Sequence, residues 1–160
     1  RAWRAPPAAE QAAAHQRFMR ELIRPATRPE ALALVREHQQ RGELTAIVTA
    51  TNEFVTRPIA AAFGVETLIA VELERDAAGA VTGRIQGTPS FREGKTVRVQ
   101  QWLHGLGRRV QDSERVTVYS DSTNDLPLLE LATHPVATNP SPALEAIARE
   151  RGWPLLKLFP

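Results

Sequence analysis

Two aspartates, Asp121 and Asp125, stand four residues apart behind a β-branched run at residues 116–119. The run is typical of a buried strand, and Pro127 fits the first turn of a following helix. In open α/β sheets, ligands bind at the carboxyl ends of parallel strands. Two close carboxylates repel and need a cation or a proton between them, and hard oxygen ligands suit Mg²⁺. Taken alone, the same residues also fit a well-capped turn.

Two more residues, Thr49 and Lys95, stand at the ends of predicted elements, where a side chain can reach a ligand. Thr49 follows a short apolar run at residues 44–48, and Lys95 stands at the start of a helix expected from Gly94. A lysine at a helix start is disfavoured by the helix dipole, so we expect an anionic group to offset it. The sequence disfavours a nucleotide-binding P-loop, because the glycine that it requires five residues before Gly94 is replaced by Pro89 and no strand runs directly into this stretch.

Strands and helices alternate along the chain, which predicts a mostly parallel α/β sheet with one antiparallel hairpin. Strands are expected at residues 44–48, 65–71, 71–74, 81–85, 116–119, 135–138 and 153–159. Helices are expected at residues 8–24, from Pro29 to Gly42, from Gly94 to Gly105 or Gly107, from Asn124, and from Ser141 to Gly152. A further helix is expected to be capped by Thr56, with Pro58 in its first turn, and to end at Gly64.

Composition restricts the class of protein. The 160 residues are 42% hydrophobic, enough for one domain with a core, and the net charge is only +2. No basic run or basic–aromatic pattern indicates nucleic-acid binding. No cysteine is present, and no apolar stretch approaches the ~20 residues that cross a bilayer or resembles a secretion signal. We therefore expect a soluble, cytoplasmic protein that binds neither nucleic acid nor membrane.

Three stretches follow one another in an order that resembles a known family. They read Val-Thr-Ala-Thr at 48–51, Gly-Lys at 94–95 and Ser-Asp-Ser-Thr-Asn-Asp at 120–125. They resemble motifs two, three and four of the haloacid dehalogenase (HAD) superfamily, in its phosphoserine-phosphatase-like branch (subfamily IB). The resemblance implies a HAD-like Rossmannoid three-layer α/β fold with a mostly parallel sheet and a β-hairpin. It also implies the remnant of a helical cap at residues 1–25 before a core domain at residues 26–160.

The resemblance implies a Mg²⁺-dependent phosphate-monoester hydrolase that acts on a small phosphorylated metabolite through an aspartyl-phosphate. Thr49 would bind a phosphoryl oxygen, Lys95 would neutralise negative charge, and Asp121 would ligate Mg²⁺. By the same match, the catalytic residues are Thr49, Lys95, Asp121 and Asp125, the cofactor-binding residues are Ala50, Thr51 and Asn124, and the metal-binding residues are Asp121 and Asp125.

One family motif does not occur in these residues. The family begins with a strand that ends in Asp-x-Asp-x-Thr, and no aspartate precedes Thr49. The family's nucleophile is the first aspartate of that motif, so we predict that these residues alone are inactive. We expect its strand in the middle of the sheet. The first hypothesis is a phosphatase fragment, completed by the N-terminal segment or by another copy in a homo-oligomer. The second hypothesis is a non-catalytic remnant that binds a phosphorylated ligand or a partner.

Overall fold

The strands of the protein form two separate three-stranded sheets. The computed structural model describes residues 13–14, 16–23, 27–79 and 81–159. The first sheet has the order β1 (Ala46–Asn52), β2 (Thr67–Arg75), β3 (Val81–Gln86), and the second has the order β4 (Thr117–Ser120), β5 (His134–Thr138), β6 (Leu155–Leu156). The helical segments are η1 (Met19–Ile23), α3 (Pro29–Gln40), α4 (Glu53–Ala62), α5 (Glu93–Gly105), η2 (Val110–Asp112), η3 (Thr123–Asp125), α6 (Leu126–Leu131) and α7 (Pro142–Glu150).

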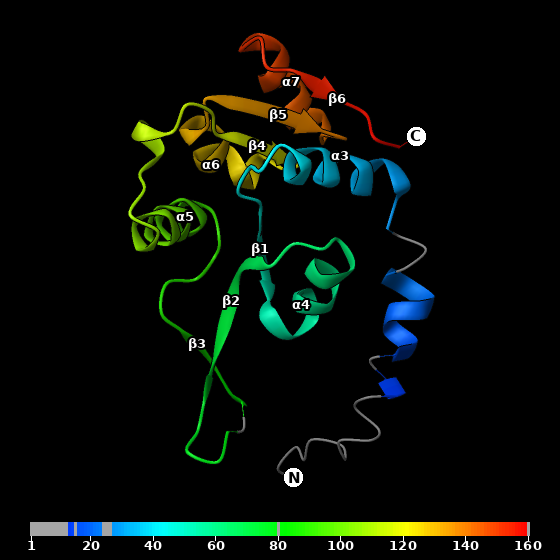
Figure 1. Cartoon of the computed structure of the whole chain (residues 1–160), viewed down its shortest axis with the longest axis vertical. Coiled ribbons are helices and arrows are strands. Elements are labelled where there is room, and N and C mark those ends of the chain that lie inside the picture. Colours follow the sequence, from blue (N-terminus) through cyan, green and yellow to red (C-terminus); the bar gives the residue numbers. More distant parts are fainter. Residues whose placement is uncertain (1–12, 15, 24–26, 80, 160) are drawn as a thin grey trace.

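The mixed α/β class and the parallel pairing are confirmed. β1 pairs with β2 in parallel, and β4, β5 and β6 pair in parallel. β2 also pairs with β3 in antiparallel fashion, which gives the expected hairpin. In the view of Figure 1, the second sheet lies at the top, the first sheet lies below it beside α4, and α3 and α5 lie between them.

Two local expectations for the region around β1 are wrong. The strand begins and ends later than residues 44–48, and it extends through Thr49 to Asn52. β1 stays paired with β2 up to its last residue, because Asn52 lies opposite Val71 after an irregularity in register. The cap of α4 is Asn52, whose side chain accepts from the Val55 amide (3.1 Å), and not Thr56. Thr56 lies inside the helix and donates to the Asn52 carbonyl (2.9 Å).

The other elements differ from expectation mainly at their ends. The last strand is only Leu155–Leu156, because the Leu158 amide donates to the Asn139 side chain (2.8 Å) instead of to a neighbouring strand. α5 has the expected apolar face at Val99 and Leu103, but Leu106 is half exposed beyond the end of the helix. Most of the proposed cap remnant at residues 1–25 lies outside the described residues.

Two hydrophobic clusters form the core. The first cluster joins the half built on β1–β3 to the half built on β4–β6. In it, Ile69 of β2 packs with Val99 and Leu103 of α5 and with Leu128 of α6. The second belongs to the β4–β6 half alone and consists of fully buried residues, which are Leu129, Ala137, Leu144 and Ala148. α5 therefore holds both halves together from between the sheets.

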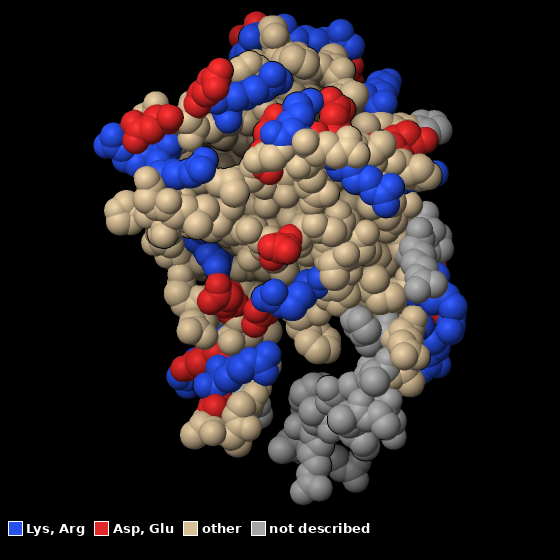
Figure 2. All heavy atoms as spheres, viewed as in Figure 1, with Lys and Arg blue, Asp and Glu red and all other residues tan. Residues whose placement is uncertain are grey.

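The face of the molecule in Figure 2 carries no large patch of one charge sign. Acidic and basic side chains alternate over the face in Figure 2, and neither sign forms a continuous patch there. Among the residues that the structure describes, no helix is both long enough and apolar enough to cross a membrane.

Candidate active site

A buried ion pair connects the third and fourth motif stretches. Lys95, in the first turn of α5, donates from Nζ to Oδ1 of Asp125 over 2.6 Å. Their side chains are only 10% and 14% exposed. This carboxylate supplies the anionic group that the position of Lys95 at a helix start requires. The contact spans thirty residues of sequence, so the packing of α5 against α6 is what brings the two groups together.

The loop before Lys95 explains why a glycine precedes it. A Cβ added to Gly94 would lie 2.0 Å from the carbonyl oxygen of Pro89, a contact that only a backbone shift could relieve. Ser90, fully buried in the same loop, donates its hydroxyl proton to the Ile69 carbonyl of β2 (3.4 Å). The loop is therefore fixed to the first sheet, and this fixes where α5 begins and where Lys95 points.

The second Asp125 oxygen is held by the end of β4. The Ser120 hydroxyl donates to Asp125 Oδ2 (2.8 Å), and the Ser122 amide donates to the Ser120 hydroxyl (3.2 Å). Ser122 in turn accepts from the Asn124 amide (3.2 Å) and so caps η3. Sequence reasoning missed Ser120, although its position directly before Asp121 at a strand end was a signal. Both oxygens of Asp125 are thus occupied by protein donors.

Asp121 differs from Asp125 in its surroundings. Its side chain is exposed and makes no hydrogen bond or ion pair with any described residue. Its main-chain carbonyl accepts from the Ser141 amide (2.8 Å), which ties it to the loop after β5. The exposed side chain of Asn124 likewise has no hydrogen bond within the described part of the chain. Asp121 and Asn124 thus present oxygen-bearing side chains at the carboxyl end of β4 that no described residue binds.

The residues of the second motif stretch lie at the carboxyl end of β1. Thr49 is partly buried and its hydroxyl accepts from the Thr51 amide (3.1 Å). Ala50 and Thr51 are exposed. No hydrogen bond or ion pair between described residues joins Thr49 to Lys95, Asp121 or Asp125. The structure thus brings Lys95 and Asp125 into contact and leaves Thr49 and Asp121 free to meet a ligand.

The surroundings of the two predicted metal-binding residues, Asp121 and Asp125, differ. Mg²⁺ keeps several waters and binds through one or two carboxylates plus substrate phosphates, and the free Asp121 carboxylate suits such an open site. Asp125 already accepts from Lys95 and Ser120. Within the described residues, no group of three or more acidic, histidine or cysteine side chains gathers to hold a metal.

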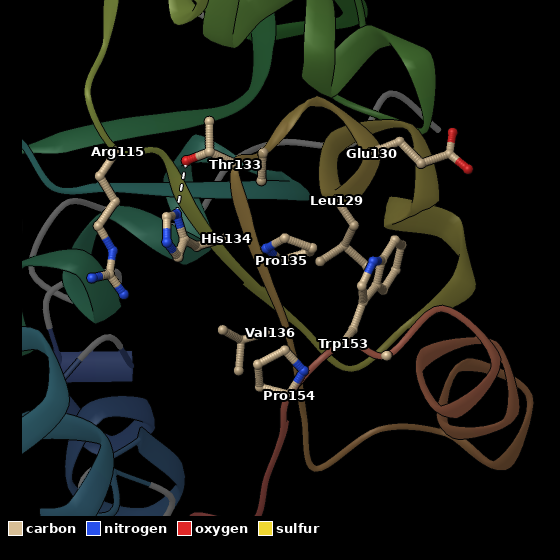
Figure 3. A pocket seen from close by; sticks show the side chains of 11 residues that line it. Arg115, Leu129, Glu130, Thr133, His134, Pro135, Val136, Trp153 and Pro154 are labelled. Atoms are coloured by element: carbon tan, nitrogen blue, oxygen red, sulfur yellow. Dashed lines mark hydrogen bonds between the residues drawn. The ribbon is translucent and has the colours of Figure 1, made fainter.

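A surface pocket of about 440 Å³ lies at the opposite ends of the strands. Its residues precede or begin β4, β5 and β6, as with Arg115, His134 and Pro154. In Figure 3, Arg115 and His134 lie on one side of it and Trp153 on the other. None of the site residues expected from sequence lines this pocket, so the hollow is separate from the candidate site.

The profile of the haloacid dehalogenase-like hydrolase family matches residues 1–130. The chain belongs to this family. It is 44% identical over 142 residues to a protein named histidinol-phosphatase from Neisseria meningitidis, covering 89% of this chain and 64% of that protein. It is 34% identical over 120 residues to phosphoserine phosphatase SerB1 of Mycobacterium tuberculosis, covering 75% of this chain and 38% of that protein. This HAD chain thus spans less than two thirds of the length of these relatives.

Solved structures support the HAD fold. A protein of unknown function from Bordetella pertussis Tohama I is 55% identical, with a TM-score of 0.91 over 96% of this chain and 69% of that one. A substrate-bound phosphoserine phosphatase is 20% identical, with a TM-score of 0.58 over 79% of this chain and 56% of that one. At that identity, the second likeness concerns the fold alone.

Proposed function

We propose that this HAD chain is the larger part of a Mg²⁺-dependent phosphatase that hydrolyses phosphate monoesters through an aspartyl-phosphate. The observation that carries the proposal is the buried Lys95–Asp125 pair beside the free Asp121 carboxylate at the end of a parallel strand. The names of the relatives, histidinol-phosphatase and phosphoserine phosphatase, support the same reaction. Phosphoryl transfer depends mostly on positioning and on charge neutralisation, which these groups can supply.

Each side chain has a defined part in this proposal. Lys95 would place its ammonium group against the negative charge of the phosphoryl group, and Asp125 and Ser120 would keep it oriented. Asp121 would hold Mg²⁺, with Asn124 helping to position it, and the ion would neutralise charge on the phosphoryl oxygens. The Thr49 hydroxyl would donate a hydrogen bond to a phosphoryl oxygen, and the exposed residues Ala50 and Thr51 would lie beside that group.

We propose that the nucleophile comes from an extended segment that pairs between β1 and β4. Within the described chain, β1 and β4 each pair with one strand only, so each sheet ends there. A segment carrying Asp-x-Asp-x-Thr would join the two sheets and place its aspartate between Thr49 and Asp121. The segment would come from the N-terminal part of the protein or from a second copy of it. In this proposal residues 1–25 belong to a helical cap, and residues 26–160 form the core.

The substrate class that the relatives support is a small 2-amino alkyl phosphate. Histidinol phosphate and phosphoserine, the compounds in the names of two relatives, are both phosphate esters of a primary alcohol beside an amine-bearing carbon. A small charged metabolite of this kind is held inside cells, which favours a cytoplasmic enzyme. The rates of phosphate release from these two compounds and from a simple aryl phosphate would show how much the amine contributes to turnover.

Phosphate release in the presence of Mg²⁺ tests the proposal. Residues 1–160 alone should show no turnover, and the same residues joined to a segment with Asp-x-Asp-x-Thr should hydrolyse the two amino alkyl phosphates. Asp121→Asn should lower turnover of the joined protein about 100-fold or more, whereas Asp112→Asn, at an exposed aspartate paired with Arg109, should not.

Three results would count against parts of the proposal. Robust turnover by residues 1–160 alone would contradict the need for an added nucleophile. Unchanged turnover in Asp121→Asn would contradict the metal assignment. Phosphate binding without turnover in the joined protein would favour the second hypothesis, a non-catalytic remnant that binds a phosphorylated ligand.

A further inference from the structure

A buried histidine connects α3 to the strand that carries Asp121. The side chain of His38 is only 11% exposed, at the end of α3. Its Nε2 lies 2.7 Å from the hydroxyl of Tyr119 on β4, and the two rings meet edge to face with centroids 5.5 Å apart. Its Nδ1 contacts the Glu43 carboxylate, which also accepts from Arg41 Nε (2.6 Å). The contact between His38 and Tyr119 joins residues 81 positions apart.

The partners of the imidazole determine its hydrogen-bonding roles. A carboxylate only accepts, so Nδ1 donates to Glu43, and Nε2 forms the hydrogen bond with the Tyr119 hydroxyl; Arg41 Nη2 also lies 3.1 Å from Nδ1. Both nitrogens are therefore used, and the ring has one orientation. An apolar side chain would fill the same space without the cost of burying a polar ring. The hydrogen bond of the imidazole therefore fixes the distance and direction between α3 and Tyr119 of β4, which a hydrophobic contact would not do.

The side chains of the last two residues of β4 form hydrogen bonds on opposite faces of the strand. Tyr119 binds His38 of α3, and the next residue, Ser120, binds Asp125, which pairs with Lys95 of α5. Side chains of successive strand residues point to opposite faces. α3 precedes β1 and its Gln39 side chain donates to the Gly64 carbonyl after α4 (2.8 Å), while α5 packs against β1 and β2. Both contacts therefore join the first half of the molecule to the end of β4, directly before Asp121.

We propose that His38 and Tyr119 are positioning residues that fix the end of β4, and so the Asp121 carboxylate, relative to the motif at the end of β1. The proposal rests on the phosphatase function proposed above, because it assigns the two side chains a part in placing Asp121. Glu43 acts through His38 by fixing the tautomer and orientation of its ring.

Matched substitutions can separate positioning from general stability. In His38→Gln the longer amide reaches the place of Nε2 and can still bind Tyr119. In His38→Asn the shorter amide reaches only the place of Nδ1 and loses Tyr119. Tyr119→Phe removes the hydroxyl and leaves the ring. Amide hydrogen exchange in the full chain is the measurement, read at Ser141, whose amide donates to the Asp121 carbonyl (2.8 Å), and at Trp153, whose amide donates to Ala148 (2.8 Å) in the same half.

Exchange at Ser141 should be about 3- to 10-fold faster in His38→Asn and Tyr119→Phe, which is the loss of about one hydrogen bond. It should be close to unchanged in His38→Gln, and exchange at Trp153 should be unchanged in all three. Equal acceleration at both amides, no acceleration at Ser141, or equal effects of His38→Gln and His38→Asn would overturn the proposal.

A Mg²⁺ titration of the same proteins tests the underlying function separately. Tyr119→Phe and His38→Asn should weaken Mg²⁺ binding about 3- to 10-fold, in line with the same lost hydrogen bond, and Asp121→Asn should weaken it further. Equal binding by the unaltered protein and Asp121→Asn would contradict the metal assignment in the proposed function. The exchange at Ser141 would still decide whether His38 and Tyr119 hold the end of β4.

Discussion

The two halves of the molecule are stabilised in different ways. In the half built on β4–β6, the core residues Leu129, Ala137, Leu144 and Ala148 are fully buried and close together in the sequence. In the half built on β1–β3, every residue of β3 is exposed, and the hairpin projects from the body in Figure 1. Its central strand, β2, packs against α4 and contributes Ile69 to the cluster that it shares with α5 and α6. The comparison teaches that the second half has a core cluster of its own, whereas Ile69 of the first half packs in a cluster shared by both halves.

The largest effect is expected from removing a core side chain of the second half. Leu144→Ala should lower the free energy of unfolding by about 2–5 kcal/mol, because a fully buried leucine leaves a cavity. Urea denaturation would measure it. The matched control is Leu44→Ala before β1, where the leucine is 52% exposed and the change should stay within about 0.5 kcal/mol. Similar losses in both variants would contradict the contrast between the halves.

The next effect concerns the ion pair that joins the halves. Lys95→Met should destabilise the protein by about 1–3 kcal/mol, because it leaves the largely buried Asp125 carboxylate without its cation. Arg149→Met is the control: it removes an exposed partner of Glu145 within the second half and should cost about 0–1 kcal/mol. Denaturant unfolding measures the free energy of unfolding of both variants. A larger decrease in Arg149→Met than in Lys95→Met would show that the buried pair does not hold the halves together.

A smaller effect is expected at the end of β1. Asn52→Ala should destabilise the first half by about 1 kcal/mol, because the side chain that caps α4 by accepting from Val55 is lost. Asn52→Asp should restore most of that stability, since aspartate caps equally well. The midpoint of thermal unfolding reports both. If Asn52→Asp were as unstable as Asn52→Ala, the cap would not be the source of the effect.

The smallest effect on stability is expected at Glu43, and it should be recognised by its dependence on pH. Hydrogen bonds from His38, and then from Arg41, hold the pKa of Glu43 below its ordinary value of 4.5. A carboxyl group with a lowered pKa in the folded state stabilises the protein above its unfolded pKa, and this contribution is lost as the pH falls through the folded pKa. The stability difference between Glu43→Gln and the unaltered protein should therefore be present at pH 6 to 7 and shrink below about pH 4.

Denaturation at several pH values would measure this difference. Glu66→Gln is the control, because Glu66 makes no ion pair or side-chain hydrogen bond with a described residue. A difference between Glu43→Gln and the unaltered protein that stays constant from neutral to acid pH would show that the lowered pKa of Glu43 does not contribute to stability.

Local sequence signals determined much of this architecture. The turn residues at 76–79 between the runs at 71–74 and 81–85 predicted the hairpin, and Ser141 followed by Pro142 predicted the start of α7. The order of the three motif stretches indicated the family that the profile shows. These signals work because turns, caps and strand runs depend on neighbouring residues. The misfit of Lys95 at a helix start likewise called for an anionic partner, which is a local requirement.

Tertiary structure decided which groups meet. Lys95 pairs with Asp125 and not with Asp121 because α5 packs against α6, thirty residues further along. His38 finds Tyr119 across 81 residues, and no periodicity or spacing in the sequence encodes that contact. Gly94 is required because the Pro89 carbonyl approaches it, a contact set by how the loop folds back. Such contacts depend on the placement of whole elements, and that placement follows from burying the shared core between the two halves.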